Sequence, residues 1–321
     1  MKVEIKKDIN RGIETIIKLK DAYEKKEIID FINIPDEIIP HNMEKGSNQH
    51  LLFLTFVSGI AYLRKEEQLW NAARTTWGDE NTSYVFNPEQ VLKTPIEKLK
   101  KDLNQYNLFE DVLQARKWSI GHLLLTDKRR ARKNDINIWL NMAQFLSDFD
   151  SNIQTLFKNY DNDVFKIIDL LMMEPYSKCF PEYHKRRKVI VWITRLKRNS
   201  NIILKQVEKL SVPIGVHIIR ATFMSGSIIG STTSLDLDLE DLCAEFWQEV
   251  YKVGRDKIKL IPLEFEIFLW ILGKYGCSIS RSDRLCRFKE KCPISEFCSS
   301  HKIEMLDGFI KINVDQKNKI N

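Results

Sequence analysis

The chain has 321 residues, of which 43% are hydrophobic and 29% are charged, and its formal net charge is +6. This composition is typical of a globular protein and excludes an intrinsically disordered chain. No apolar run approaches the roughly 18 residues that a membrane span needs, so we expect no membrane partner. The small positive charge permits nucleic-acid binding but does not require it.

Helical periodicity dominates the first half of the chain, whereas long alternating strands are scarce, and this predicts an all-α fold. We expect a helical lead-in over residues 1–45. A broad apolar face then predicts buried helices between residues 47 and 77. Asn87 is suited to cap the start of one helix, and Thr94 followed by Glu97 predicts a capping box for the next.

The second half continues the helical pattern, and it divides the chain into segments. Two predicted helices start near Leu108 and Asp135, and a third runs through Val164 to Leu171. Further helices are predicted over residues 185–198, 202–210, 236–251 and 262–275. The expected organisation is a lead-in (1–45), a helical lobe (46–175), a further helical region (176–276), a cysteine loop (277–300) and a tail (301–321).

Four of the six cysteines lie close together near the C-terminus, with the spacing C-x8-C-x5-C-x5-C: Cys277, Cys286, Cys292 and Cys298. Four thiolates on one loop can hold a [4Fe–4S] cluster, with one cysteine for each iron. Zinc is the alternative metal, although zinc sites usually pair their cysteines at short intervals, which this spacing lacks.

Disulfides would need an oxidising compartment. The N-terminal residues have no apolar segment of the kind found in secretory signals, so we expect an intracellular, reducing location, the cytoplasm. The two remaining cysteines, Cys179 and Cys243, have apolar neighbours and are predicted to be buried, inert thiols.

Basic residues form three runs, at 128–133, 184–188 and 195–198. A single charge run is usually a solvated surface. Two of these runs surround one predicted helix upstream of the cysteine loop, which favours contact with phosphate. The predicted nucleic-acid contacts on this helix are Lys185, Arg186, Arg187 and Lys188.

The segments Leu269–Cys277 (LWILGKYGC) and Cys292–Cys298 (CPISEFC) resemble the iron–sulfur loop of endonuclease III-type DNA glycosylases. The family loop reads C-x6-C-x2-C-x5-C after a Gly-basic-aromatic-x-Cys run, and this chain keeps the last interval and lengthens the first two. The order of parts from about residue 45 to residue 300 also resembles the helix-hairpin-helix glycosylase superfamily.

The resemblance implies a fold of two helical lobes with a cleft between them and a C-terminal [4Fe–4S] loop. The second lobe would be split in sequence, because N-terminal residues would pack beside the C-terminal region. The implied function is that of a monomeric DNA N-glycosylase of base excision repair, which binds duplex DNA and flips an altered base into the cleft. Further DNA contacts would come from Arg220, Arg284 and Arg287, and a wedging or stacking ring from Trp77, Tyr183 or Trp192.

Two family motifs are altered in this chain. The segment Phe180–Lys185 stands where the family has its hairpin but contains no glycine. In the second motif, His217 and Arg220 match the family's His and Arg, whereas Gly215 occupies the position of the catalytic Asp. A glycine has no side chain to stabilise charge or to accept a proton.

An active enzyme would therefore need an acid from another position, and the weak candidates for a catalytic role are Asp236, Asp238, Glu182 and His217. A lysine nucleophile at position 185 or 188 is a further possibility. The alternative function is a non-catalytic iron–sulfur module that binds nucleic acid. A third is a scaffold that acts on a nucleoside or a modified base.

Overall fold

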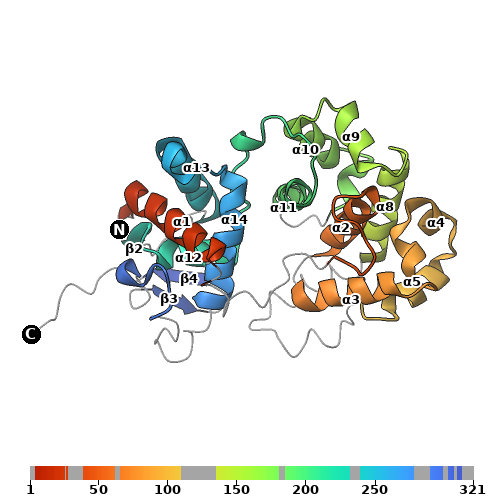
Figure 1. Ribbon diagram of the computed structural model, residues 1–321, viewed down its shortest axis with the longest axis horizontal. Helices are drawn as coiled ribbons and strands as arrows, with labels where there is room; N and C mark the ends of the chain where they lie inside the picture. The colour runs from red at the N-terminus through yellow and green to blue at the C-terminus, as the bar shows by residue number, and fades with distance from the viewer. Residues whose placement is uncertain are drawn as a thin grey trace, which may run out of the picture. The chain divides into compact units, whose positions relative to one another are not determined.

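The computed structural model describes residues 4–25, 27, 39–61, 66–109, 135–180, 185–231, 239–277, 290–298, 303–306 and 309–312. The described chain is mostly helical (Figure 1), which confirms the predicted all-α character as far as helical content is concerned. It divides into two compact units, of which unit 1 contains Met1–Ile34 and Glu208–Asn321, and unit 2 contains Pro35–Val207.

Unit 1 joins the N-terminal helix to the C-terminal part of the chain. Its elements are β1 (Glu4–Lys7), α1 (Ile9–Glu24), α12 (Val216–Met224), β2 (Ile228–Ser231), α13 (Leu239–Ile258), α14 (Pro262–Ile271), the π-helical turn η6 (Leu272–Gly276), the short 3-10 helix η8 (Ser295–Phe297), β3 (Ile303–Leu306) and β4 (Phe309–Ile312). Helix α1 packs against α13 and α14, as expected for a unit that is split in sequence (Figure 1).

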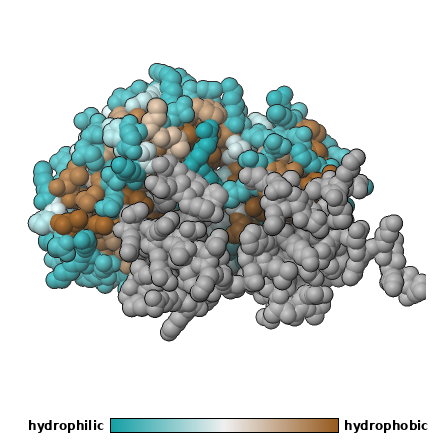
Figure 2. Space-filling model, turned by 180° about the vertical axis from the view of Figure 1, so that it is seen from behind, coloured by the Kyte–Doolittle hydropathy of each residue, from teal (hydrophilic) through white to brown (hydrophobic). Residues whose placement is uncertain are grey.

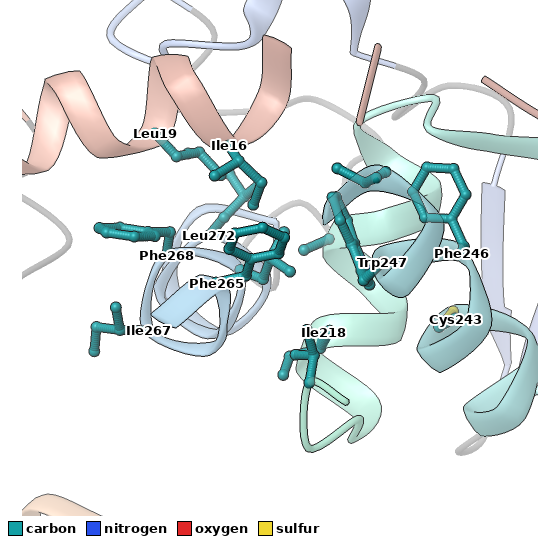
Figure 3. Close-up of a cluster of buried hydrophobic side chains, with 14 of the residues drawn as sticks. Ile16, Leu19, Ile218, Cys243, Phe246, Trp247, Phe265, Ile267, Phe268 and Leu272 are labelled. Atoms are coloured by element: carbon teal, nitrogen blue, oxygen red, sulfur yellow. The ribbon is translucent and has the colours of Figure 1, made fainter. Parts of the chain in front are cut away.

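The core of unit 1 lies where α1, α12, α13 and α14 meet (Figure 3). Ile16 and Leu19 of α1 point toward Phe265 and Phe268 of α14, and Trp247 of α13 closes the same cluster. Burial of such side chains stabilises a fold by about 1.5–3 kcal/mol each. The core therefore fixes the end of α14, from which the chain runs into the cysteine loop.

The described part of unit 1 contains four short strands, where the sequence pattern predicted none. Strand β1 pairs antiparallel with β2, with Glu4 opposite Ser231, and β3 pairs antiparallel with β4. The lead-in therefore opens with a strand and becomes helical only at Ile9. A four-residue strand that pairs with a segment distant in sequence leaves too weak a local pattern to be predicted.

Unit 2 consists of short helices around an aromatic core. Its elements are α2 (Asn48–Ile60), α3 (Glu66–Gly78), η2 (Ser83–Phe86), α4 (Pro88–Lys93), α5 (Ile96–Asn104), α8 (Asp135–Ser147), α9 (Ile153–Asn159), α10 (Val164–Met172), η4 (Tyr176–Lys178) and α11 (Lys185–Asn199). The rings of Phe53, Phe56, Phe86 and Trp139 pack together, and Trp139 Nε1 donates a hydrogen bond to the Val85 carbonyl at 2.9 Å.

Local signals at helix starts were correct in one case and wrong in another. Asn87 caps α4, where its side-chain oxygen accepts a hydrogen bond from the Gln90 amide at 3.1 Å. Thr94 makes no capping box with Glu97, because its hydroxyl donates to the Gln90 carbonyl at 2.7 Å and so closes the preceding helix. The carbonyl groups at the end of α4 and the amides at the start of α5 compete for the same short side chain.

The predicted helix over residues 202–210 is also wrong. Only a single 3-10 turn, η5 (Val207–Lys209), forms there. Lys205 instead bridges to Asp163, and its amide donates to the Asn162 carbonyl at 2.8 Å. This distant contact removes the Lys205 amide from any helix.

The described surface drawn in Figure 2 mixes hydrophilic and hydrophobic residues. Among the helices of the described ranges, none combines the length and the apolar character needed to cross a membrane.

Candidate functional site

Helix α12 begins directly after Gly215, the residue that the sequence comparison aligned with a catalytic aspartate of the glycosylases. Gly215 is the N-cap of this helix, with φ −148° and ψ 175°, and its carbonyl accepts a hydrogen bond from the Ile219 amide at 2.9 Å. This extended conformation is open to any residue. The backbone therefore does not require glycine at position 215, and an aspartate there would be a favoured N-cap.

One turn further along α12, Arg220 joins the helix to the start of the cysteine loop. Its Nη1 atom donates a hydrogen bond to the Gly273 carbonyl at 2.6 Å and lies 3.3 Å from His217 Nδ1. Gly273 belongs to η6, in which the Cys277 amide donates to the Leu272 carbonyl at 2.7 Å. The guanidinium therefore holds the π-helical turn that immediately precedes Cys277.

The prediction that Arg220 contacts DNA is not supported, because only 2% of this residue is exposed. A buried guanidinium that donates to a protein carbonyl is not available to a phosphate. We therefore assign Arg220 a structural role at the junction of α12 and η6.

The same junction depends on the absence of a side chain at Gly273. A Cβ atom at this position would lie 1.8 Å from the carbonyl oxygen of His217. The backbones of α12 and η6 are thus in direct contact. π-Helical turns inside helices often occur at functional sites, and this one ends at the first cysteine of the loop.

A group of rings and one cation surrounds the junction. The ring of Trp270 meets those of His217 and Tyr275 edge-on, at centroid distances of 6.2 and 5.6 Å. The Lys274 ammonium lies over two of these rings, 4.3 Å from the centroid of Trp270 and 4.8 Å from that of Tyr275. We call these four residues the Trp270 group. Sequence reasoning assigned it no binding role beyond the weak catalytic candidacy of His217, although Lys274 and Tyr275 belong to the Gly-basic-aromatic-x-Cys run.

Three of the four predicted cluster ligands are described. Cys277 and Cys292 are partly buried and pack against the hydrophobic core of unit 1, and Cys298 follows η8. Lys18 of α1 forms an ion pair with Glu296 of η8, which ties the N-terminal helix to this segment. Cys286 lies outside the described residues.

The described donors do not by themselves make a metal site. Within the described ranges, no group of three or more His, Cys, Asp and Glu side chains is placed to hold a metal ion. These ranges contain three of the four predicted ligands. The supporting observation is that the thiols of Cys277 and Cys292 pack against the same hydrophobic core.

The other two cysteines are buried, as predicted. Burial raises the pKa of the Cys243 thiol to about 12, which keeps it protonated and unreactive at neutral pH.

The predicted basic helix forms as α11, and its first turn contains no acidic residue. Arg186 is exposed and Arg187 is half-buried. Lys188 has a structural role, because its ammonium donates to the Ala61 carbonyl at the end of α2, at 2.7 Å. Lys185 opens the helix. The exposed cation of this run that the structure places is therefore Arg186.

Two of the three predicted wedge residues are described, and both pack against aromatic side chains of unit 2. Trp192 is fully buried and donates a hydrogen bond to Thr55 Oγ1 at 2.9 Å, so the wedge prediction is wrong for this residue. Trp77 packs against Phe53 and Phe86. Several further candidates lie outside the described residues: Asp236, Asp238, Glu182, Tyr183, Arg284 and Arg287.

No protein-family model and no curated protein sequence matches this chain. The likeness to the helix-hairpin-helix glycosylases therefore depends on the motifs in the sequence itself.

Proposed function

We propose that this chain is a DNA-binding iron–sulfur protein on the helix-hairpin-helix glycosylase scaffold, and that it excises altered bases from duplex DNA. The contact between Arg220 and the Gly273 carbonyl is the observation that carries the proposal. It joins two segments that resemble the same family and lie 53 residues apart in sequence, namely the His217–Arg220 motif and the run that leads into Cys277.

The proposed cofactor is a [4Fe–4S] cluster held by Cys277, Cys286, Cys292 and Cys298. When bound, it would supply a fixed cross-link of the cysteine loop. The protein's own residues would position the cluster's ligands. The π-helical turn and Arg220 hold Cys277, the first residue of the loop, and Lys18 anchors η8. The loop sequence is basic, and Arg284 and Arg287 are the proposed phosphate contacts there.

The proposed reaction is hydrolysis of the N-glycosidic bond of a flipped nucleotide. The bond between C1′ and the base breaks, water adds to C1′, and the departing base takes up a proton. A carboxylate normally stabilises the positive charge that develops on the sugar. Gly215 cannot supply it, so the proposal assigns this role to an acid from another position, with Glu182, Asp236 and Asp238 as candidates.

A non-catalytic nucleic-acid-binding module is the second candidate function. It is favoured by the conformation of Gly215, because an aspartate would fit the extended backbone at this helix start and yet is not present. On this alternative, the scaffold and the DNA contacts would remain while base excision would be lost.

Base release from a panel of damaged duplex oligonucleotides tests the proposal. Wild type, Gly215→Asp, Glu182→Ala, Asp236→Ala and Asp238→Ala would be compared at equal iron content. We expect release by the wild type and its loss in one alanine variant. Gly215→Asp should reduce activity, because a second carboxylate raises the pKa of the first.

Other outcomes identify the alternatives. DNA binding without base release by the wild type would overturn the enzyme and favour the module. In that case, weak release by Gly215→Asp alone would indicate a scaffold that has lost its acid. No affinity for duplex at low salt would contradict both and favour a nucleoside-sized substrate.

A further inference from the structure

A hollow of about 440 Å³ lies on the surface of unit 1, beside α13. Pockets for small molecules commonly enclose about 300–1,000 Å³, so this one is large enough for a small ligand. One face of α13 packs into the core through Cys243, Phe246 and Trp247 (Figure 3), and the opposite face lines the hollow. We call it the α13 hollow, and its charged and amide side chains are those of Lys7, Asp241, Glu245, Gln248, Glu249 and Lys252.

The charges of the α13 hollow are divided along the helix. Asp241 and Glu245 line its N-terminal part, and Lys252 lines its C-terminal part. An α-helix rises about 1.5 Å per residue, so Glu245 and Lys252 lie about 10 Å apart along its axis. The hollow therefore suits an elongated ligand that carries opposite charges at its two ends.

Lys7 of β1 forms one wall of the hollow and is already paired. Its ammonium lies 3.8 Å from a carboxylate oxygen of Glu245 and 3.5 Å from one of Glu249, which joins β1 to α13. Three carboxylates and two ammonium groups line the hollow, so one negative charge is left in excess. This excess attracts the ammonium group of a ligand and repels the phosphates of a nucleic-acid strand.

Gln248 lies between the two ends of the hollow, and its side-chain amide is unsatisfied. The Nε2 atom is buried and has no hydrogen-bond partner among the described groups. Buried polar groups of native proteins nearly always have a partner. Lys252 lies one turn further along the same side of α13. A carboxylate on a ligand would therefore meet a donor from each of these two side chains.

We propose that the α13 hollow binds a small ω-amino acid, an elongated zwitterion with an ammonium group at one end and a carboxylate at the other. The ammonium would lie beside Asp241 and Glu245, and the carboxylate would accept hydrogen bonds from Gln248 and Lys252. Hydrogen bonds with ionised partners are stronger than those between neutral groups. An α-amino acid fits less well, because its two charges lie too close together to reach both ends. The inference goes beyond the proposed function and does not depend on DNA binding.

The probe is 6-aminohexanoate, titrated into the full chain at low salt and followed by calorimetry. Hexylamine and hexanoate are the matched probes, since each keeps the six-carbon chain and one of the two charges. Wild type should bind 6-aminohexanoate at least about tenfold more tightly than either, because one charge-assisted hydrogen bond has an effect of this order. The zwitterion should also raise the Tm, since a ligand that binds only the folded chain stabilises it.

Variants of the two donors test the carboxylate end. Gln248→Met keeps the length of the side chain without the donor and should weaken 6-aminohexanoate binding about tenfold. Lys252→Gln should weaken 6-aminohexanoate binding and leave hexylamine binding within about twofold of the wild type. Lys257→Gln is the matched control, because Lys257 is exposed on α13 outside the hollow, and it should bind as the wild type does. Thermal unfolding without ligand would establish that each variant is folded.

Two results would overturn the inference. One is a wild type that binds 6-aminohexanoate no better than hexylamine and hexanoate, or binds none of the three. The other is unchanged 6-aminohexanoate affinity in both Gln248→Met and Lys252→Gln. Neither result affects the proposed function, because duplex affinity and base release are measured separately and should be the same in Gln248→Met as in the wild type.

Discussion

At the scale of single residues, Gly273 and Arg220 both stabilise the contact between α12 and η6. Gly273 lets the backbones of α12 and η6 touch, and Arg220 donates to the carbonyl of the same glycine. Neither role was evident from the sequence: Gly273 was part of a motif, and Arg220 was expected to bind phosphate. A contact between residues distant in sequence decided both.

Gly273→Ala should destabilise unit 1 strongly. The new Cβ would lie 1.8 Å from the His217 carbonyl oxygen, so a backbone has to shift. Such overpacking typically costs about 1–3 kcal/mol or more in the free energy of unfolding, which urea titration measures. Gly78→Ala is the matched control, because a Cβ at Gly78 meets no atom within 4 Å. If the two variants were equally stable, the close backbone contact between α12 and η6 would be contradicted.

His50 should make the stability of unit 2 dependent on pH. Burial, with a smaller contribution from the charge of Lys45, lowers the pKa of His50 from 6.5 to about 4. Its Nδ1 accepts a hydrogen bond from the Gly46 amide at 3.0 Å, which requires an uncharged ring. The unfolded chain therefore binds the extra proton first, and stability should fall as the pH drops from 6.5 toward 4.

Urea unfolding at several pH values would measure this slope. His50→Gln removes the titrating group, so the stability of this variant should change less than that of the wild type over the same pH range. A slope that is unchanged in the variant would assign the effect to other groups.

At the scale of secondary-structure elements, the success of sequence reasoning depended on how local each signal was. The starts of α4, α8 and α11 follow from caps and apolar periodicity within a few residues, and each lies where it was expected. Strand β1 and the loss of the helix near Lys205 reflect partners that are distant in sequence, whereas the capping box at Thr94 fails because a local acceptor, the Gln90 carbonyl, competes for its hydroxyl. In the Trp270 group, Trp270, Lys274 and Tyr275 are close in sequence, and only His217 joins them through the distant contact between α12 and η6.

The two helix starts in unit 2 give a test of this distinction. Asn87→Ala should destabilise unit 2 by about 1 kcal/mol, because the Gln90 amide loses its cap. Thr94→Ala should cost less, because its exposed hydroxyl donates to a carbonyl of α4 and caps no helix start. Thermal unfolding of the two variants would show which one loses more stability. A larger loss for Thr94→Ala would indicate that Thr94 does cap the start of α5.

At the scale of the whole molecule, the proposal requires that phosphate contacts come from side chains that are at least partly exposed. The structure reduces the predicted set, because Lys188 and Arg220 are committed to protein carbonyls. The remaining candidates on α11 include Arg186 and Arg187. Those of the cysteine loop lie outside the described residues.

Replacing Arg186 and Arg187 together by Gln should reduce the slope of log affinity against log salt by about two, near 0.9 for each lost phosphate contact on duplex DNA. The double variant Lys101→Gln and Lys158→Gln makes the same change of charge at exposed sites elsewhere in unit 2 and should leave the slope unchanged. Equal slopes for both double variants would place the phosphate contacts elsewhere.

The central claim is that the cysteine loop holds an iron–sulfur cluster. Its most direct test is the metal and acid-labile sulfide content of protein purified without oxygen, for the wild type and for Cys286→Ala. A [4Fe–4S] site predicts about four irons and about four sulfides per chain, with loss of both in the variant. Stoichiometric zinc without sulfide in the wild type, or an iron content that Cys286→Ala leaves unchanged, would contradict the account.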